Sequence, residues 1–439
     1  LLLDGARFAD ENGFEAVWTP ERHFHDFGGA YPNPAITGAA IASITQRVKI
    51  RAGSCVLPLH HPIRVAEDWS VIDNISGGRV GLAFATGWQP NDFVLAPDAF
   101  AQRKDVLMSH MEVVRRLWRG ESVEFAAPNG KMSPTRVLPR PVQVDLPIWL
   151  TVARNPETFE AAGANGVNVL THMLGMGMDE LAGNIALYRS AWAKAGHPGE
   201  GRVTLMLHTF AGACDDSVRE IVRAPMKSYL SSSIDLVRDA AWSFPTFIQK
   251  SQQTGKTPKE IFEAEPLQPD ELDALLDHAF ERYFKTSGMF GSVETCVEMV
   301  GKVKAIGVSE IACLVDFGVD ADRALAHLPY LRKVMDAAET SLAPVQRYTV
   351  AEDIRHFNAT HLQCTPSMAL MLAGDADVAA MQRLKAMMVG GEALPLELAR
   401  TLRARAPGAK LLNMYGPTET TIWSTVAELN EIGAFIPLG

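Results

Sequence analysis

Hydrophobic residues along the first 337 positions alternate between short apolar runs and longer segments in which apolar residues recur at helical spacing. The apolar runs predict strands at residues 14–19, 48–57, 79–86, 147–153, 167–171, 202–210 and 310–316. The helically spaced segments predict helices at residues 1–12, from 34, 63–75, 99–119, from 155, 178–195, 292–306 and 321–337. Strands that alternate with helices are typical of a parallel sheet covered by helices.

This alternation predicts an α/β fold. Seven strands that follow an opening helix predict a (β/α)8 barrel whose first strand would lie before residue 1. An open doubly wound sheet is the alternative, but no Gly-x-Gly-x-x-Gly follows a predicted strand. Residues 215–290 predict a long, mostly helical insertion, which in a barrel would lie over the active end.

Composition narrows the class of protein. A net charge of -10 argues against a nucleic-acid or anionic-membrane surface, and no apolar run reaches the roughly 20 residues that span a bilayer. Five scattered cysteines, without Cys-x-x-Cys spacing, predict neither disulfides nor a zinc site and favour a reduced, cytoplasmic setting. No signal peptide opens the chain, which starts inside a helical pattern without Met, so we expect a piece of a longer protein.

Polar residues gather where the predicted strands end, which is the catalytic face of such a barrel. The relevant segments are Thr19-Pro20-Glu21-Arg22-His23-Phe24, Gly53-Ser54, Leu59-His60-His61-Pro62, Ala85-Thr86-Gly87-Trp88, Ala153-Arg154-Asn155-Pro156-Glu157-Thr158, Thr171-His172, His208 and Asp316-Phe317-Gly318.

Residues 1 to about 337 resemble the bacterial-luciferase-like, flavin-dependent monooxygenases. The resemblance rests on Trp18-Thr19-Pro20-Glu21-Arg22-His23-Phe24, Leu57-Pro58-Leu59-His60-His61-Pro62, Ser76-Gly77-Gly78-Arg79 and Gly87-Trp88. It implies a TIM barrel that binds reduced FMN from a separate flavin reductase and uses O2 to transfer one oxygen atom. Within that family the chain is most similar to the subfamily embedded in natural-product assembly lines.

The flavin phosphate is expected at the start of the helix after the fifth barrel strand. Asn155 is a plausible cap before Pro156, free backbone N–H groups follow, and Arg154 and Thr158 lie nearby. An ordinary capped helix is the alternative interpretation.

The flavin ring is expected against the third and fourth strands. The resemblance implies a cis peptide bond at Gly53-Ser54 under the ring, where a glycine in a strand would otherwise indicate only a bulge. Thr86 and Trp88 follow the next strand, and Trp88 is a candidate wall of the ring site, although an aromatic residue there is as often simple packing.

The catalytic assignment departs from the family at one position. Luciferases carry two histidines in the matching Glu-His-His-Phe motif, whereas here Arg22 replaces the first and only His23 remains. The role of the first histidine cannot be transferred, and Arg22 is a candidate to hold the flavin or an acyl carbonyl. His172 is the next candidate acid or base. His60 and His61 predict no metal site, because no carboxylate sits at ligand spacing.

The tail belongs to a different protein class. Residues 338–348 read as a linker, and residues 349–439 resemble part of a nonribosomal peptide synthetase adenylation domain. The resemblance rests on the run from Asn413 to Thr421, which holds the ATP-motif residues Tyr415, Thr418 and Glu419, and on the segments 361–367 and 388–394. The Gly-rich loop, ribose-binding Asp and catalytic Lys are not in this piece, so ATP and Mg²⁺ concern only the complete domain. We therefore expect the barrel to be an insertion in a synthetase module.

The resemblance also implies an amino-acid pocket similar to that of glycine-activating domains. Its matching residues here are Gln363, Met388, Gly390, Met414, Ile422 and Trp423. Bulky Met, Ile and Trp side chains would fill the space of a substrate side chain, although the same residues suit an ordinary core.

These observations predict hydroxylation of the alpha carbon of a glycyl or peptidyl-glycyl thioester on a carrier protein, leading to a terminal amide. Three alternatives remain open: N- or beta-hydroxylation of another amino acid, hydride transfer from a reduced deazaflavin, and a non-catalytic insert that braces the synthetase.

Overall fold

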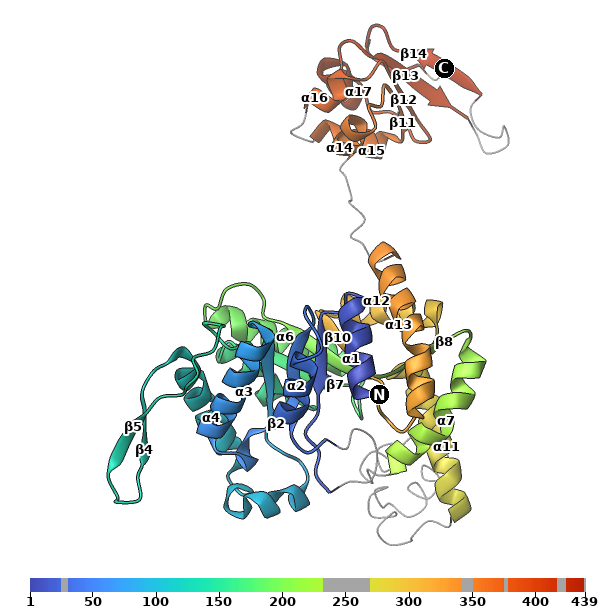
Figure 1. Cartoon of the computed structure of the whole chain (residues 1–439). Helices are drawn as coiled ribbons and strands as arrows, with labels where there is room; N and C mark the ends of the chain where they lie inside the picture. Colours follow the sequence, from blue (N-terminus) through green and yellow to red (C-terminus); the bar gives the residue numbers. More distant parts are fainter. Residues whose placement is uncertain (25–30, 232–268, 342–349, 375–377, 417–423, 438–439) are drawn as a thin grey trace, which may run out of the picture. The chain divides into compact units, whose positions relative to one another are not determined.

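The chain is described from a computed structural model in which residues 1–24, 31–231, 269–341, 350–374, 378–416 and 424–437 are placed (Figure 1). It divides into two compact units, Leu1–Leu342 and Ala343–Gly439, which are considered one at a time. In the described residues, no helix is both long and apolar enough to cross a membrane.

The first unit is built on a parallel sheet, as the alternating pattern predicts. The strands are β1 (Ala16–Thr19), β2 (Lys49–Val56), β3 (Val80–Ala85), β6 (Ile148–Thr151), β7 (Asn168–His172), β8 (Val203–Gly212), β9 (Met289–Ser292) and β10 (Glu310–Leu314). They pair in the order β1-β2-β3-β6-β7-β8-β10, and β9 pairs with the far end of β8. β9 is an additional strand that the sequence pattern did not reveal, because it spans only four residues next to a helix. In the described residues, β1 and β10 are not paired with each other.

Helices connect these strands and cover the outer face of the sheet. They are α1 (Leu2–Glu11), α2 (Pro34–Ala42), α3 (Pro62–Ser76), α4 (Arg103–Arg119), α5 (Pro156–Ala164), α6 (Met178–Lys194), α12 (Val293–Ala305) and α13 (Ala321–Ser341). Short 3-10 turns replace the predicted first turn of α4. An exposed hairpin of β4 (Val123–Ala126) and β5 (Met132–Thr135) follows α4 and was not predicted.

The sheet curls so that side chains on its inner face meet across the interior. The rings of Trp18 on β1 and Trp149 on β6 meet edge to face at 5.3 Å. The guanidinium of Arg51 on β2 lies over both rings, and its Nη1 atom is 2.5 Å from Oε1 of Glu310 on β10. Since β2 and β10 lie toward opposite ends of the pairing order, this ion pair shows how far the sheet has closed on itself.

Helices α5 and α6 pack closely because a glycine lies at their contact. A Cβ atom on Gly163 would lie 2.3 Å from the carbonyl oxygen of Tyr188 and 2.9 Å from the backbone nitrogen of Trp192. The absence of a side chain at Gly163 therefore sets the distance between α5 and α6, and with it the position of the first turn of α5.

The described parts of the insertion are helical, as predicted. α7 (Asp215–Ser231) and α11 (Pro269–Thr286) pack on each other, and residues 232–268 lie outside the described part of the chain. Phe280 of α11 packs with Phe290 of β9 and Phe317 beyond β10 in one apolar cluster. Arg223 of α7 pairs with acidic residues of α11. The insertion is thus attached to the sheet at its carboxyl end.

The second unit has a four-stranded sheet with helices on one face. The strands β11 (His361–Cys364), β12 (Ala386–Gly390) and β13 (Lys410–Tyr415) are parallel, and β14 (Thr425–Glu428) is antiparallel. The helices are α14 (Val350–His356), α15 (Pro366–Gly374), α16 (Val378–Gln382) and α17 (Leu396–Arg405). All four contribute to a core that contains Met387, Val389 and Leu411.

Candidate functional site

Polar groups of the first unit converge where the parallel strands end. Trp149 of β6, Leu170 of β7 and Met206 of β8 pack together on the inner face of the sheet. Two residues further along the same strands, and therefore on the same face, lie Thr151, His172 and His208. His23 and Arg22 follow β1 directly. The candidate residues predicted from the strand ends therefore belong to one end of the curled sheet.

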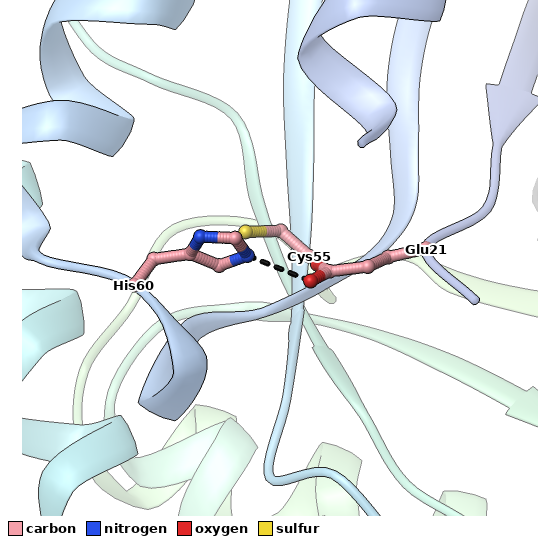
Figure 2. A group of neighbouring side chains, drawn as sticks. All are labelled: Glu21, Cys55 and His60. Atoms are coloured by element: carbon pink, nitrogen blue, oxygen red, sulfur yellow. Dashed lines mark hydrogen bonds and ion pairs between the residues drawn. The ribbon is translucent and has the colours of Figure 1, made fainter. Parts of the chain in front are cut away.

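The carboxylate of Glu21 is the centre of a buried hydrogen-bond cluster just after β1 (Figure 2). Its Oε1 atom is 2.7 Å from Nε2 of His60 and 3.0 Å from Nε2 of His23. Its Oε2 atom accepts a hydrogen bond of 2.7 Å from the backbone N–H of Val56. Because an ionised carboxylate only accepts, both imidazoles donate through Nε2, which leaves Nδ1 of His23 as the basic atom.

Charges within this cluster shift two pKa values. Burial lowers the pKa of His60, but the hydrogen bond and charge of Glu21 outweigh burial, so the pKa of His60 is raised. Burial and the charge of Glu21 together raise the pKa of the Cys55 thiol well above its usual value. Cys55 therefore remains a protonated thiol at neutral pH.

The same residues include ligand types that metals use. Glu21, Cys55 and His60 each place a ligand atom within 4.8 Å of the others. The 2.7 Å separation between Glu21 and His60 is that of a hydrogen bond, and the thiol is protonated, so we interpret the group as a hydrogen-bond cluster. Sequence spacing could not reveal this carboxylate beside His60, because Glu21 lies 39 residues earlier.

Arg22 and His172 lie near a second group that the insertion completes. His208 of β8 is fully buried, and its Nδ1 atom is 2.8 Å from the hydroxyl of Tyr283 of α11. Its ring also meets that of Tyr229 of α7 at 4.3 Å. Burial raises the pKa of Tyr229, although a hydrogen bond with Arg22 and the charge of Arg22 oppose the change. Arg22, His172, His208 and the two tyrosines thus form one polar group.

Two buried polar atoms at this end have no hydrogen-bond partner in the described part of the chain. They are Nε2 of His208 and Oγ1 of Thr151. Unsatisfied buried polar atoms are uncommon in folded proteins and often indicate where a ligand binds. The sequence placed His208 on its predicted strand without giving it a role, and Thr151 was not singled out. The signal was the alternation of Thr204, Met206 and His208 toward the interior of β8.

Burial keeps the two histidines of this group neutral. It lowers the pKa of His172 to about 4 and that of His208 to about 3, and the positive charge of Arg22 also lowers the pKa of His208. Neither ring is therefore a strong base near pH 7. This weakens His172 as a candidate base and favours His23, whose Nδ1 atom is free of the Glu21 bond.

These pKa values predict that acid destabilises the protein before its carboxylates titrate. Below about pH 6.5 the unfolded chain protonates both imidazoles while the folded chain does not, so the free energy of unfolding falls by up to about 1.4 kcal/mol per pH unit for each. His60, with a raised pKa, is more stabilising at pH values below its unfolded pKa of about 6.5 than above it, so it opposes part of this fall near pH 7 and has no further effect at lower pH. Urea unfolding from pH 7 to 5 should show the fall, and His208→Gln should reduce its slope. Equal slopes would contradict the assignment.

The predicted phosphate-binding residues lie together at the start of α5. Asn155 caps the helix by accepting a hydrogen bond of 2.9 Å from the backbone N–H of Glu157. Thr158 is half-buried in the first turn. Arg154 is half-exposed and pairs with Glu180 of α6 at 3.3 Å. An anion bound here would therefore compete with Glu180 for Arg154.

The predicted ring-binding residues are less close together. The peptide bond between Gly53 and Ser54 on β2 is cis, as the resemblance implied. Ser54 and Thr86 are half-buried at the ends of neighbouring strands. Trp88 is 72% exposed, so most of its side chain is accessible to solvent and is not buried against the strand ends.

Two hollows lined by described residues lie at the other end of the strands. Cavities of about 700 and 540 Å³ adjoin the amino-terminal ends of β8 and β10, and the smaller one is lined by Arg51, Trp149 and Arg202. Arg51 and Arg202 are already paired with Glu310. These two cavities are therefore not next to the histidines and other polar groups at the carboxyl end of the strands. We place the site at the carboxyl end, because the unsatisfied atoms and the imidazoles gather there.

In the second unit, four predicted pocket residues share one face of the sheet. Gln363 pairs in register with Met388, and Gly390 pairs with Met414. Since the helices pack on the alternate positions, this face is the one without the helical core. Tyr415 follows on β13 and is exposed, whereas Thr418, Glu419, Ile422 and Trp423 lie outside the described residues.

Comparison with known families gives two matches along the chain. The luciferase-like monooxygenase family matches residues 2–310, and the AMP-binding enzyme family matches residues 309–437. The oxygenase component of the flavin-dependent trigonelline monooxygenase of Acinetobacter baylyi is 26% identical over 359 residues, which covers 80% of this chain and 92% of that protein. The alkanal monooxygenase alpha chain of Photorhabdus luminescens is 26% identical over 197 residues, covering 45% of this chain and 54% of that protein.

Solved structures share the fold. The monooxygenase RslO1 from Streptomyces bottropensis aligns with a TM-score of 0.58 at 21% identity, covering 76% of this chain and 93% of that one. The oxygenating constituent of 3,6-diketocamphane monooxygenase from Pseudomonas putida, solved with FMN, also gives 0.58 at 17% identity, covering 76% and 90%.

Proposed function

Since the chain belongs to the luciferase-like monooxygenase family and is a flavin-dependent oxidoreductase, we propose that it hydroxylates the alpha carbon of a glycyl unit held as a thioester on a carrier protein. The observation that carries the proposal is the AMP-binding match on the same chain, with four predicted glycine-pocket residues on one face of its sheet. We assign residues 1–337 to the oxygenase, 338–348 to a linker and 349–439 to part of an adenylation domain. The remainder of a synthetase module and a separate flavin reductase are the expected partners.

The residues at the carboxyl end of the strands fit FMN. The first turn of α5, with Arg154, Asn155 and Thr158, would hold the phosphate through backbone N–H groups and positive charge. Gly53, Ser54 and Thr86 would border the ring. Two unsatisfied polar atoms on the inner face remain for carbonyl groups of bound molecules. When bound in its reduced form, FMN supplies two electrons with which one atom of O2 enters a C–H bond and the other leaves as water.

The protein's own residues are proposed to accept the proton and to exclude water from the site. Glu21 holds His23 with its Nδ1 atom available, so His23 is the proposed proton acceptor, and the negative charge of Glu21 stabilises the imidazolium. Arg22 is proposed to hold an acyl carbonyl or the flavin. His172 stays neutral near pH 7 and serves as a hydrogen-bonding wall. Helices α7 and α11 would cover this end and keep water out.

The product of alpha-hydroxylation accounts for a terminal amide. A peptidyl alpha-hydroxyglycyl thioester breaks its N–Cα bond, which releases a peptide amide and leaves a glyoxylyl thioester on the carrier. Mass spectrometry of a carrier-bound peptidyl-glycine, supplied with reduced FMN and O2, should therefore show either a gain of one oxygen or release of the amide. An unchanged thioester would contradict the proposal. Oxygen on nitrogen or on another residue would redirect it to a different regiochemistry, and turnover without O2 would indicate hydride transfer.

Arg154→Ala is expected to weaken FMN binding about tenfold, because one charge-assisted contact to phosphate contributes about 1.4 kcal/mol. Arg119→Ala is a matched control, since Arg119 is also half-exposed and paired with one carboxylate, Asp145, at 2.7 Å. Fluorescence titration of FMN would compare the two variants. Equal FMN affinities in the two variants would remove Arg154 from the phosphate site.

A further inference from the structure

The inner face of β8 presents a hydrogen-bond donor that the folded chain does not use. His208 is 0% exposed, and its Nε2 atom has no partner among the described residues, whereas Nδ1 is 2.8 Å from the hydroxyl of Tyr283. The two nitrogens of one ring therefore differ: the insertion satisfies Nδ1, and nothing in the described part of the chain satisfies Nε2.

Tyr283 determines which nitrogen carries the proton. Burial raises the pKa of Tyr283 well above its usual value, so its hydroxyl keeps its hydrogen. When that hydroxyl donates to Nδ1 of His208, which lies 2.8 Å away, the hydrogen of the neutral ring lies on Nε2, and this is the tautomer we assign. Nε2 is thus a fixed donor in a dry environment, where such a group binds an acceptor strongly.

The surroundings of His208 connect it with the candidate site. It lies near enough to Arg22 and His172 to interact with both electrostatically, and the centroids of the Tyr229 and Phe317 rings are 4.3 and 5.5 Å from that of its own ring. Of the other buried side-chain atoms without a partner among the described residues, Oγ1 of Thr151 lies on the same inner face. Two atoms without partners on one wall are better explained by a bound molecule than by two independent packing defects.

We propose that His208 is a ligand-binding residue whose Nε2–H donates to a carbonyl oxygen of a molecule bound at the carboxyl end of the strands. This inference rests on the proposed function, which supplies two sources of such an oxygen: the carbonyls of the flavin ring and the acyl carbonyl of the thioester. Tyr283 is its positioning residue. A neutral histidine cannot release a full proton readily, so His208 binds and orients rather than acting as the acid.

The test uses variants that separate binding from stability. His208→Phe combined with Tyr283→Phe removes both polar partners and keeps two aromatic rings, a change that is usually nearly neutral for folding. His208→Gln restores an N–H group at similar reach. Tyr283→Phe alone keeps the imidazole but no longer fixes its tautomer. Each variant of the full chain would be examined by urea unfolding, by FMN titration and by turnover of carrier-bound glycyl thioester.

The double variant is expected to unfold at the same urea concentration as the wild type or higher, because an unsatisfied buried donor is gone. Either the affinity for FMN or kcat/KM for the glycyl thioester should nevertheless fall about tenfold or more, as expected for a lost hydrogen bond in a dry site. A loss in FMN affinity identifies the flavin carbonyl, and a loss in kcat/KM at unchanged FMN affinity identifies the acyl carbonyl. His208→Gln should recover part of the loss, and Tyr283→Phe should show a smaller one.

Unchanged FMN affinity and unchanged kcat/KM in the double variant would overturn the inference, as would a loss of activity that only follows a loss of stability. If the wild type does not oxidise the glycyl thioester at all, the proposed substrate is wrong. The inference is then decided by FMN affinity and urea unfolding alone, where reduced affinity at full stability supports it and unchanged affinity overturns it.

Discussion

Glu21→Gln is expected to lower turnover at least about a hundredfold and the free energy of unfolding by about 2–4 kcal/mol, because it removes a buried charge that several donors share. The carboxylate is 0% exposed and accepts hydrogen bonds from His23, His60 and the backbone N–H of Val56. An amide offers one oxygen and one NH2 group, so in either orientation the NH2 group opposes a donor. His23 would then lose the contact that keeps Nδ1 free.

A spectroscopic measurement separates positioning from simple destabilisation. Since Glu21 is the main cause of the raised pKa of His60, NMR titration of His60 should show a lower pKa in the variant. Glu112→Gln is a suitable control, because Glu112 is 56% exposed and paired only at 3.4 Å with Arg115. Glu112→Gln should change the free energy of unfolding by less than about 1 kcal/mol and leave the turnover rate unchanged. An unchanged His60 titration in Glu21→Gln would contradict the role given to Glu21.

Gly163→Ala is expected to lower the free energy of unfolding by about 3 kcal/mol or more. The new methyl group would collide with backbone atoms, which cannot move aside as a flexible side chain can. The new Cβ atom would lie 2.3 Å from the carbonyl oxygen of Tyr188, so α5 must move away from α6. FMN affinity should fall as well, since Asn155 and the first turn of α5 move with the helix.

Gly183→Ala provides the matched control. Gly183 is an exposed residue of α6 at which a Cβ atom would meet nothing within 4 Å. The higher helix propensity of alanine should make that variant neutral or up to about 1 kcal/mol more stable. Urea unfolding of both variants gives the comparison. Equal stabilities would show that the contact between α5 and α6 is looser than described.

The elements of the fold were predictable because most strands here are buried on both faces and most helices are amphipathic. Apolar residues dominate the runs at Val203–Gly212 and Lys49–Val56, and the structure buries most of both strands although they include Arg51 and His208. β9 was missed because Met289–Ser292 is too short to show a period, and it forms by extending the ladder of β8. The hairpin at 123–135 was missed because its exposed strands have little hydrophobic alternation.

The site was predictable only where chemistry follows a strand end. Arg22, His23, His172 and Asn155 were proposed in that way, and they remain predictions. The partnership of Glu21 with His60 depends on two loops meeting in space, and the role of His208 depends on a helix of the insertion reaching β8. Neither contact leaves a spacing in the sequence. The sequence did place His208 on its strand among the candidate polar residues, but it gave no signal of the role that the contact with Tyr283 suggests.

Hydrogen–deuterium exchange of the chain with and without FMN tests directly where the flavin binds, because two cavities lined by described residues lie at the end of the strands opposite the candidate site. We expect FMN to slow exchange in residues 53–56 and 153–159 and to leave residues 198–202 unchanged. Protection confined to 198–202 and 305–309, or no protection anywhere at saturating FMN, would contradict a flavin site at the carboxyl end.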